Sequence, residues 1–130
     1  MEIQYLDHLV LTVRDIQTTC DFYTTVLGMR VITFSEGRKA LQFGNQKINL
    51  HQLGLEFEPK ATKPTPGSAD MCFITDLSID AVQAHILSCQ VHIIEGPVLR
   101  MGTVGPIESL YFFDPDGNLI EVSTVAGMES

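Results

Sequence analysis

The sequence nearly repeats itself, and this repeat restricts the possible folds more than any other feature. A segment that starts at His8 (HLVLTVRDIQTTCDFYTTVLGMRVI) is followed 62 residues later by a similar one that starts at Asp70 (DMCFITDLSIDAVQAHILSCQVHII). The ends of the two halves repeat at an offset of 70, so that FGNQKINLH from Phe43 matches FDPDGNLIE from Phe113. Such a chain is expected to build two copies of one small unit.

The first copy has the pattern of a strand, a helix and three more strands. Residues 5–13 alternate between apolar and other side chains, as a half-buried strand does. Asp15 is a suitable N-cap and Gly28 a suitable C-terminal residue for a helix whose apolar stripe is Ile16, Cys20, Tyr23 and Leu27. Strands are predicted over 29–34, 39–43 and 47–53, the last two joined at Gly44-Asn45.

The second copy follows a segment rich in turn-forming residues. Residues 54–68 contain three prolines and two glycines, which predicts a linker. Strands are then expected over 70–75, 91–94, 108–113 and 118–124, with a helix capped by Ser78 and a glycine-rich loop at 100–106.

These elements predict an α+β fold made of two βαβββ modules. We expect a single domain over 1–130, with module one at 3–53, the linker at 54–68 and module two at 69–124. Each module would be a curved four-stranded sheet with a helix on its convex face. The concave faces would form a cup in which polar side chains converge.

Composition excludes several classes of protein. The chain is 45% hydrophobic and has no run of 18 apolar residues, so it is expected to be globular and to lack a membrane span. The net charge is −8, all of it from residues 66–130, which hold nine acidic residues and one basic residue, Arg100. Such a chain should repel nucleic acids and anionic membranes. The start Met1-Glu2-Ile3 resembles no secretory signal, which favours a cytoplasmic protein.

Four polar residues interrupt the apolar strands at equivalent places of the repeat: His8, His51, Asp70 and Glu121. Alternation assigns all four to concave positions, and it places Asn49 on the same face as His51. Imidazole and carboxylate groups suit Zn, Ni, Mn, Co or Fe(II). Two histidines and one carboxylate leave coordination positions open, as catalysis requires. The sequence therefore predicts one divalent metal ion, although a single strand histidine is more often structural.

Three stretches resemble the vicinal oxygen chelate superfamily, which includes glyoxalase I, extradiol dioxygenases and fosfomycin-resistance thiol transferases. They are DHLVLTV (7–13), DFYTTVLGM (21–29) and YFFDPDGNLIEV (111–122). RKALQFGNQKINLH (38–51) and FEPKA (57–61) resemble, more narrowly, a glyoxalase-domain-containing group that includes bacterial virulence-associated proteins.

The resemblance implies paired βαβββ modules and a divalent metal. By position, His8, His51, Asp70 and Glu121 match the ligand positions of the first, fourth, fifth and last strands. Glyoxalase I usually has Glu where this chain has His51, and His or Gln where it has Asp70, which puts lactoylglutathione lyase activity in doubt. Asp70 is expected either to bind the metal directly or to orient a histidine.

The resemblance implies three alternative functions. The first is a metal-dependent lyase or isomerase acting on a small substrate with vicinal oxygens, with Glu121 as ligand and general base. The second is an Fe(II) dioxygenase, and the third a metal-free drug-binding protein. Arg38 is expected to grip a carboxylate or phosphonate, and Asn49 and Arg100 to contact the substrate. A homodimer is expected by the same resemblance.

Overall fold

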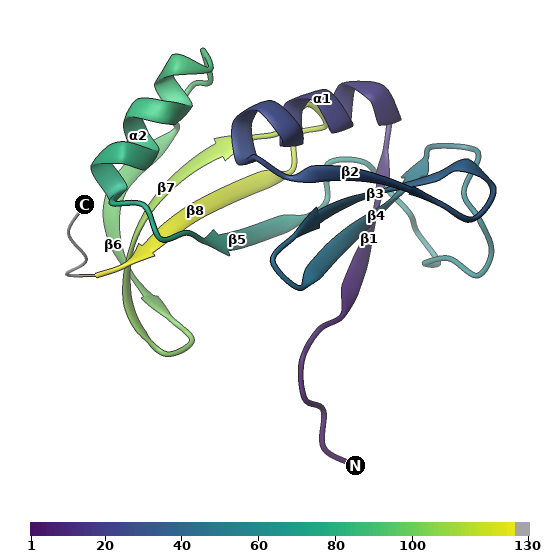
Figure 1. Cartoon of the computed structure of the whole chain (residues 1–130), viewed down its shortest axis with the longest axis horizontal. Helices are drawn as coiled ribbons and strands as arrows, with labels where there is room; N and C mark the ends of the chain where they lie inside the picture. Colours follow the sequence, from purple (N-terminus) through teal and green to yellow (C-terminus); the bar gives the residue numbers. More distant parts are fainter. Residues whose placement is uncertain (127–130) are drawn as a thin grey trace. The chain divides into compact units, whose positions relative to one another are not determined.

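The computed structural model describes residues 1–126, which form two units, Met1–Ser68 and one that begins at Ala69 (Figure 1). The first unit contains β1 (His8–Val13), α1 (Ile16–Leu27), β2 (Arg30–Phe34), the short 3-10 helix η1 (Ser35–Gly37), β3 (Arg38–Phe43) and β4 (Gln46–Gln52). The second contains β5 (Asp70–Ile74), α2 (Ile79–Ser88), β6 (Glu95–Gly102), β7 (Gly105–Phe113) and β8 (Leu119–Val125).

Each unit is a four-stranded sheet with one helix, which confirms the predicted α+β class and the βαβββ modules. The strand order is β1-β4-β3-β2 in the first sheet and β5-β8-β7-β6 in the second. In both sheets the first and last strands of the module pair in parallel, and the other pairs are antiparallel. Neither helix is long and apolar enough to cross a membrane, as far as the chain is described.

The core of the first unit lies between its sheet and α1, which contacts β2, β3 and β4. Alternation places one set of strand residues toward the helix, and these are buried: Leu11, Val13, Leu41, Ile48 and Leu50. The helix buries Thr19, Cys20, Tyr23 and Val26 against them. The predicted stripe of α1 is therefore correct at its centre, while Ile16 and Leu27 at its ends are half-buried.

The ends of α1 form as the sequence predicts. The side chain of Asp15 accepts a hydrogen bond of 2.9 Å from the backbone N–H of Thr18, which satisfies one of the free N–H groups of the first turn. Gly28 ends the helix with φ +66°, a left-handed conformation that glycine adopts without steric cost. Ser78 caps α2 in the same way, accepting from the N–H of Ala81 at 3.2 Å.

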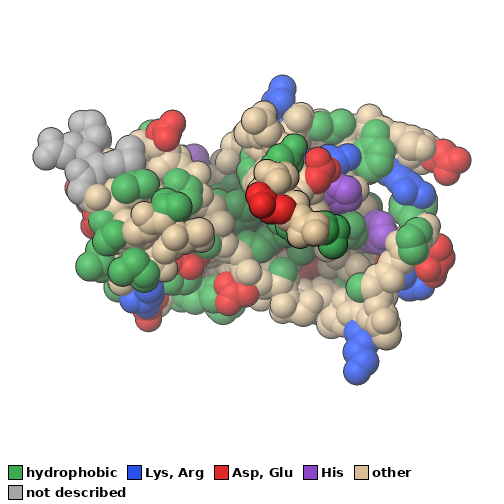
Figure 2. Space-filling view, turned by 90° about the horizontal axis from the view of Figure 1, so that it is seen from below, with side chains coloured by type: hydrophobic (Ala, Val, Ile, Leu, Met, Phe, Trp, Pro, Cys, Tyr) green, Lys and Arg blue, Asp and Glu red, His purple; other side chains and the backbone are tan. Residues whose placement is uncertain are grey.

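In the second unit α2 contacts β7 and β8. Ile79, Val82 and Ile86 are its buried residues, and they are three of the four members of the predicted stripe. The strand residues on the helix side of the sheet are also buried: Leu110, Phe112, Ile120 and Val122. Other large hydrophobic side chains stay exposed, and Figure 2 shows green side chains at the surface among charged ones.

The prediction for strand six was wrong. Residues 91–94 form no strand, and β6 instead runs over Glu95–Gly102, through the predicted glycine-rich loop. Gly96 and Pro97 lie at a shift of register between Glu95 and Val98. β6 is an edge strand, where a bulge and a proline are tolerated because one side of the strand has no ladder to complete.

Candidate functional site

In the first unit, the sheet face opposite α1 carries the polar residues that alternation assigns to it. Lys47, Asn49 and His51 share this face of β4, opposite Ile48 and Leu50. The β1 residues paired with them are His8, Val10 and Thr12. Both predicted histidine ligands of this unit therefore lie on one face.

The two histidines are not neighbours within this sheet. His8 pairs with Lys47, whereas His51 pairs with Thr12, four residues further along β1. At about 3.3 Å per residue this separates them by roughly 13 Å along the strands. His8 is exposed, and its Nδ1 lies 2.8 Å from Oδ2 of Asp7. Asp7 therefore orients the His8 ring and leaves Nε2 as the atom for a ligand.

His51 is buried, with 8% of its surface exposed. Its ring meets the ring of Phe57 edge to face, with centroids 5.7 Å apart. Burial lowers the pKa of His51, the charge of Arg38 lowers it further, and Glu56 opposes both. His51 is therefore neutral at pH 7, and neutral imidazole is the form that binds metal ions.

Because the pKa of His51 is lowered, we expect the metal-free protein to lose stability as the pH falls below about 6.5. Unfolded His51 takes up a proton near that pH and folded His51 does not, so the loss continues until the pH passes the folded pKa. Urea unfolding in EDTA between about pH 5 and 8 measures this loss. His51→Gln should reduce the change of the unfolding free energy with pH over this range. An unchanged pH dependence would mean that the lowered pKa of His51 is not its cause.

Arg38 opens β3, one residue before the predicted start of this strand, and faces the same side as His51. It is the neighbour of His51 if the β3–β4 register, in which Ala40 pairs with Asn49, is continued. Its guanidinium carbon lies 3.8 Å from the centroid of the Phe57 ring, a cation–π contact. Nε of Arg38 and Oδ1 of Asn49 are both buried and have no hydrogen-bond partner among the described residues.

In the second unit, a row of polar side chains crosses all four strands on the face opposite α2. Cys72 pairs with Glu121, Glu121 with Tyr111, and Tyr111 with Glu95. Asp70 lies on the same face, two residues before Cys72. Glu121 and Asp70, the predicted ligands of this unit, are thus diagonal neighbours on adjacent strands.

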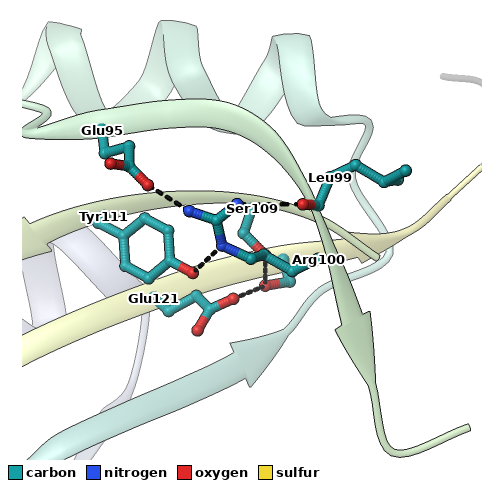
Figure 3. A network of polar contacts seen from close by, with 7 residues as sticks. Glu95, Leu99, Arg100, Ser109, Tyr111 and Glu121 are labelled. Atoms are coloured by element: carbon teal, nitrogen blue, oxygen red, sulfur yellow. Dashed lines mark hydrogen bonds and ion pairs between the residues drawn. The ribbon is translucent and has the colours of Figure 1, made fainter. Parts of the chain in front are cut away.

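Arg100 lies in β6, and the prediction that it sits in a loop was wrong. Its Nε donates to the hydroxyl of Tyr111 at 3.1 Å, its Nη1 donates to the carbonyl of Leu99 at 3.1 Å, and its Nη2 pairs with the carboxylate of Glu95 (Figure 3). Three bonds fix the guanidinium over the sheet and leave it partly neutralised by Glu95.

A cavity of about 340 Å³ lies at this network, lined by Ile94, Glu95, Arg100, Tyr111 and Leu119. It is widely open to solvent and places the polar groups of Glu95, Arg100 and Tyr111 beside the apolar side chains of Ile94 and Leu119. The prediction that Arg100 contacts a substrate is compatible with this place.

Glu121 is held by neighbours on its own face. The hydroxyl of Ser123 lies 3.4 Å from its Oε2, and Ser123 is in turn 2.6 Å from the hydroxyl of Ser109 (Figure 3). Burial raises the pKa of Tyr111, and a hydrogen bond to Glu121 adds to the rise against the effect of Arg100. Tyr111 is therefore a neutral hydroxyl that can donate to the Glu121 carboxylate.

Cys72 is an exposed member of this row. Partial burial raises the pKa of its thiol, and Glu121 adds to the rise, while the hydroxyl of Ser123, 3.3 Å away, lowers it. A protonated thiol is a poor nucleophile and a poor metal ligand. None of the three cysteines forms a disulfide within residues 1–126.

The predicted metal ligands are divided between the two units, His8 and His51 in the first and Asp70 and Glu121 in the second. Among residues 1–126, no three His, Cys, Asp or Glu side chains form a group that could hold a metal ion. The chemistry of the donor set nevertheless fits a divalent cation, since it consists of imidazoles, one of them neutral by burial, and carboxylates. Ligation by these residues stays a prediction.

The strand register also departs from the sequence repeat. His51 pairs with a residue four positions after His8, but Glu121 pairs with Cys72, only two positions after Asp70. The repeat therefore predicts the shared face correctly but not the position along the strands. Phe57 and Glu95 were missed, because each lies outside any periodic stretch of the sequence.

The chain belongs to the Glyoxalase/Bleomycin resistance protein/Dioxygenase superfamily, whose family model matches residues 5–122. It is 60% identical over 123 residues to virulence protein STM3117 of Salmonella typhimurium, an alignment that covers 95% of this chain and 85% of that protein. It is 56% identical over 124 residues to the glyoxalase domain-containing protein RDO1 of Mycosarcoma maydis, covering 95% of this chain and 70% of that one. These relatives match the narrower group that the sequence resembled.

Solved structures agree with the fold. The crystal structure of virulence protein STM3117 matches with a TM-score of 0.96 and 59% identity, over 97% of this chain and all of that one. Lactoylglutathione lyase from Agrobacterium tumefaciens matches with a TM-score of 0.72 at 20% identity, covering 95% of this chain and 96% of that one. TnmS3, an antibiotic-binding protein from Streptomyces, matches with a TM-score of 0.75 at 22% identity, covering 97% and 99%. The last two bear on the fold alone.

Proposed function

We propose that this protein is a divalent-metal-dependent lyase or isomerase of the glyoxalase type, acting on a small substrate with vicinal oxygens. The observation that carries the proposal is the pair of polar sheet faces opposite the helices, with the neutral imidazole of His51 on one and the hydrogen-bonded carboxylate of Glu121 on the other. Membership in the superfamily supports it, since the superfamily includes glyoxalases.

His8, His51 and Glu121 are the proposed ligands, with Asp70 as a fourth ligand or as an orienting group. Zn, Ni, Mn, Co or Fe suits this set. A bound cation would stabilise the negative charge that develops on the substrate oxygens when a neighbouring C–H is deprotonated. The set is completed either within one chain or by a second copy.

The protein's own residues supply binding and proton transfer. A carboxylate oxygen of Glu121 takes the proton from the carbon beside a substrate carbonyl and returns it to the adjacent carbon. The hydroxyl of Tyr111 positions that carboxylate, and Arg100 holds the substrate at the cavity that both residues line. Glu121→Gln should abolish turnover while metal is retained, and full activity in that variant would exclude the role of base.

Elemental analysis tests the metal directly. For protein purified without chelator or metal-affinity resin, we expect about one divalent ion per chain. The double variant His8→Ala/Glu121→Ala should lose it, because it removes one donor from each unit. The double variant His85→Ala/Glu108→Ala removes the same groups from outside the proposed set and should keep the ion.

The same preparation separates the alternative functions. If protein loaded anaerobically with Fe(II) takes up oxygen in the presence of catechols, the protein is a dioxygenase and the lyase proposal is rejected. If the wild-type protein holds no metal and takes none up on titration, both enzyme proposals fail, and a drug-binding protein is left.

A further inference from the structure

Arg38 and Arg100 both face the polar sides of the sheets, and they differ in their partners. Arg100 forms an ion pair with Glu95 and hydrogen bonds with Tyr111 and Leu99. Arg38 forms no ion pair with any described residue, and its buried Nε lacks a hydrogen-bond partner. A buried donor of a charged group is costly to leave unpaired. Arg38 therefore has a donor without an acceptor, which a bound anion can satisfy.

The guanidinium of Arg38 is also preorganised. Its 3.8 Å contact with the face of Phe57 fixes the plane of the group, and β3 holds its backbone beside β4. A guanidinium whose plane is set by stacking loses little further freedom when a planar carboxylate binds to it. The ring of His51 meets the same Phe57 ring edge to face, with centroids 5.7 Å apart, and holds that ring from the adjacent strand β4.

Asn49 contributes the complementary atom. Its Oδ1 is buried and unpartnered, on the same sheet face as Arg38 and on the adjacent strand. Nε of Arg38 is a hydrogen-bond donor and Oδ1 of Asn49 is an acceptor. A single ligand that bonds to both must therefore offer an acceptor to Arg38 and a donor to Asn49. A carboxylate with a hydroxyl on the next carbon has this pair of groups. An unsubstituted carboxylate satisfies only the arginine.

We propose that Arg38 and Asn49 form a subsite for a 2-hydroxycarboxylate, in which Nε of Arg38 donates to the carboxylate and the ligand hydroxyl donates to Oδ1 of Asn49. The assignment deepens the proposed function, on which it rests, because the carboxylate and hydroxyl oxygens are vicinal. It narrows the substrate class to small hydroxy acids or compounds that contain that group.

The test is an NMR titration of the metal-free full-length protein, in which the Arg38 Nε–H signal is followed. The probes are glycolate, acetate, ethylene glycol and inorganic phosphate. We expect glycolate to shift the signal and to bind about five-fold more tightly than acetate, the value of one additional hydrogen bond. Ethylene glycol, which lacks the charge, should leave the signal in place.

Variants separate the two contacts. Arg38→Gln, followed by the side-chain amide signal of Asn49, should weaken glycolate binding at least about ten-fold, the loss of a charge-assisted bond. Asn49→Ala should bind acetate as before and lose the preference for glycolate. The matched control is Arg30→Gln, since Arg30 lies on the same sheet face in the edge strand β2 and bonds to Gln42 at 3.1 Å. It should bind glycolate as the wild type does, and far-UV circular dichroism checks that all variants fold.

The subsite is refuted if glycolate leaves the Arg38 signal unmoved, or if Arg38→Gln binds glycolate like the wild type. Tighter binding of phosphate than of glycolate would indicate a site for a tetrahedral anion, and it would overturn the assignment to a 2-hydroxycarboxylate. Because the titration needs no metal, its failure is independent of elemental analysis. If the protein holds a metal but does not bind glycolate, only the subsite is rejected. If it binds glycolate but holds no metal and takes none up, only the lyase proposal is rejected.

Discussion

Replacing Phe112 by alanine should lower the free energy of unfolding by about 3–5 kcal/mol. Phe112 is 0% exposed near the C-terminal end of β7, on the side of the sheet that α2 covers, and it pairs with Ile120. Its removal takes a large ring out of a closely packed core and leaves a cavity that the rigid sheet cannot fill. Urea unfolding followed by far-UV circular dichroism measures the loss, since the chain has no tryptophan.

The neighbouring residue provides a matched control. Phe113 is 50% exposed and points to the other face of the same strand. Phe113→Ala removes the same ring, and we expect it to cost less than about 1 kcal/mol. Equal losses in the two variants would mean that the second sheet does not bury its α2-facing side in the way described.

Replacing Gly96 by alanine should cost about 2–5 kcal/mol, the sum of backbone strain and overpacking. Gly96 has φ +107°, which side-chain-bearing residues rarely adopt, and a Cβ there would lie 2.4 Å from the carbonyl oxygen of Ser109. Ser109 belongs to β7, so relief of the clash must move β6 away from its partner. Thermal and urea unfolding measure the loss.

Gly117→Ala separates the cost of backbone strain from the cost of a clash between the new Cβ and a neighbouring strand. Gly117 has φ +89°, and no atom lies within 4 Å of a Cβ built there. We expect this variant to lose only the cost of the left-handed conformation, about 1–2 kcal/mol. If it loses as much as Gly96→Ala, close packing at the bulge is not what requires glycine at position 96.

The fold could be predicted from the sequence because local signals agree with the global pattern. Asp15 and Ser78 start the helices, Gly28 ends the first, and period-2 alternation assigns the strand faces. The exception is β6, where Gly96 and Pro97 have the composition of a turn. Only the pairing with β7 makes this segment a strand, and such a tertiary contact leaves no local signal.

The candidate site could be predicted only in part. Alternation gives the face of His51 and Glu121, since it depends on one strand at a time. The distance between His8 and His51 depends on the register of β1 against β4. A shift of the register by two residues leaves every side chain on the same face, so alternation cannot detect it. Phe57 orients Arg38 from the segment after β4, which has no periodicity.

The strand pairings imply an order of events during synthesis of the chain. Every pair of the first sheet joins residues up to Gln52, and every pair of the second joins residues from Asp70 onward. The parallel pair closes a long loop in each sheet, of 39 residues between Thr12 and His51 and of 49 between Cys72 and Glu121. The first sheet can therefore finish pairing while the second is still being translated, so nascent chains need not choose between equivalent strands of the two repeats.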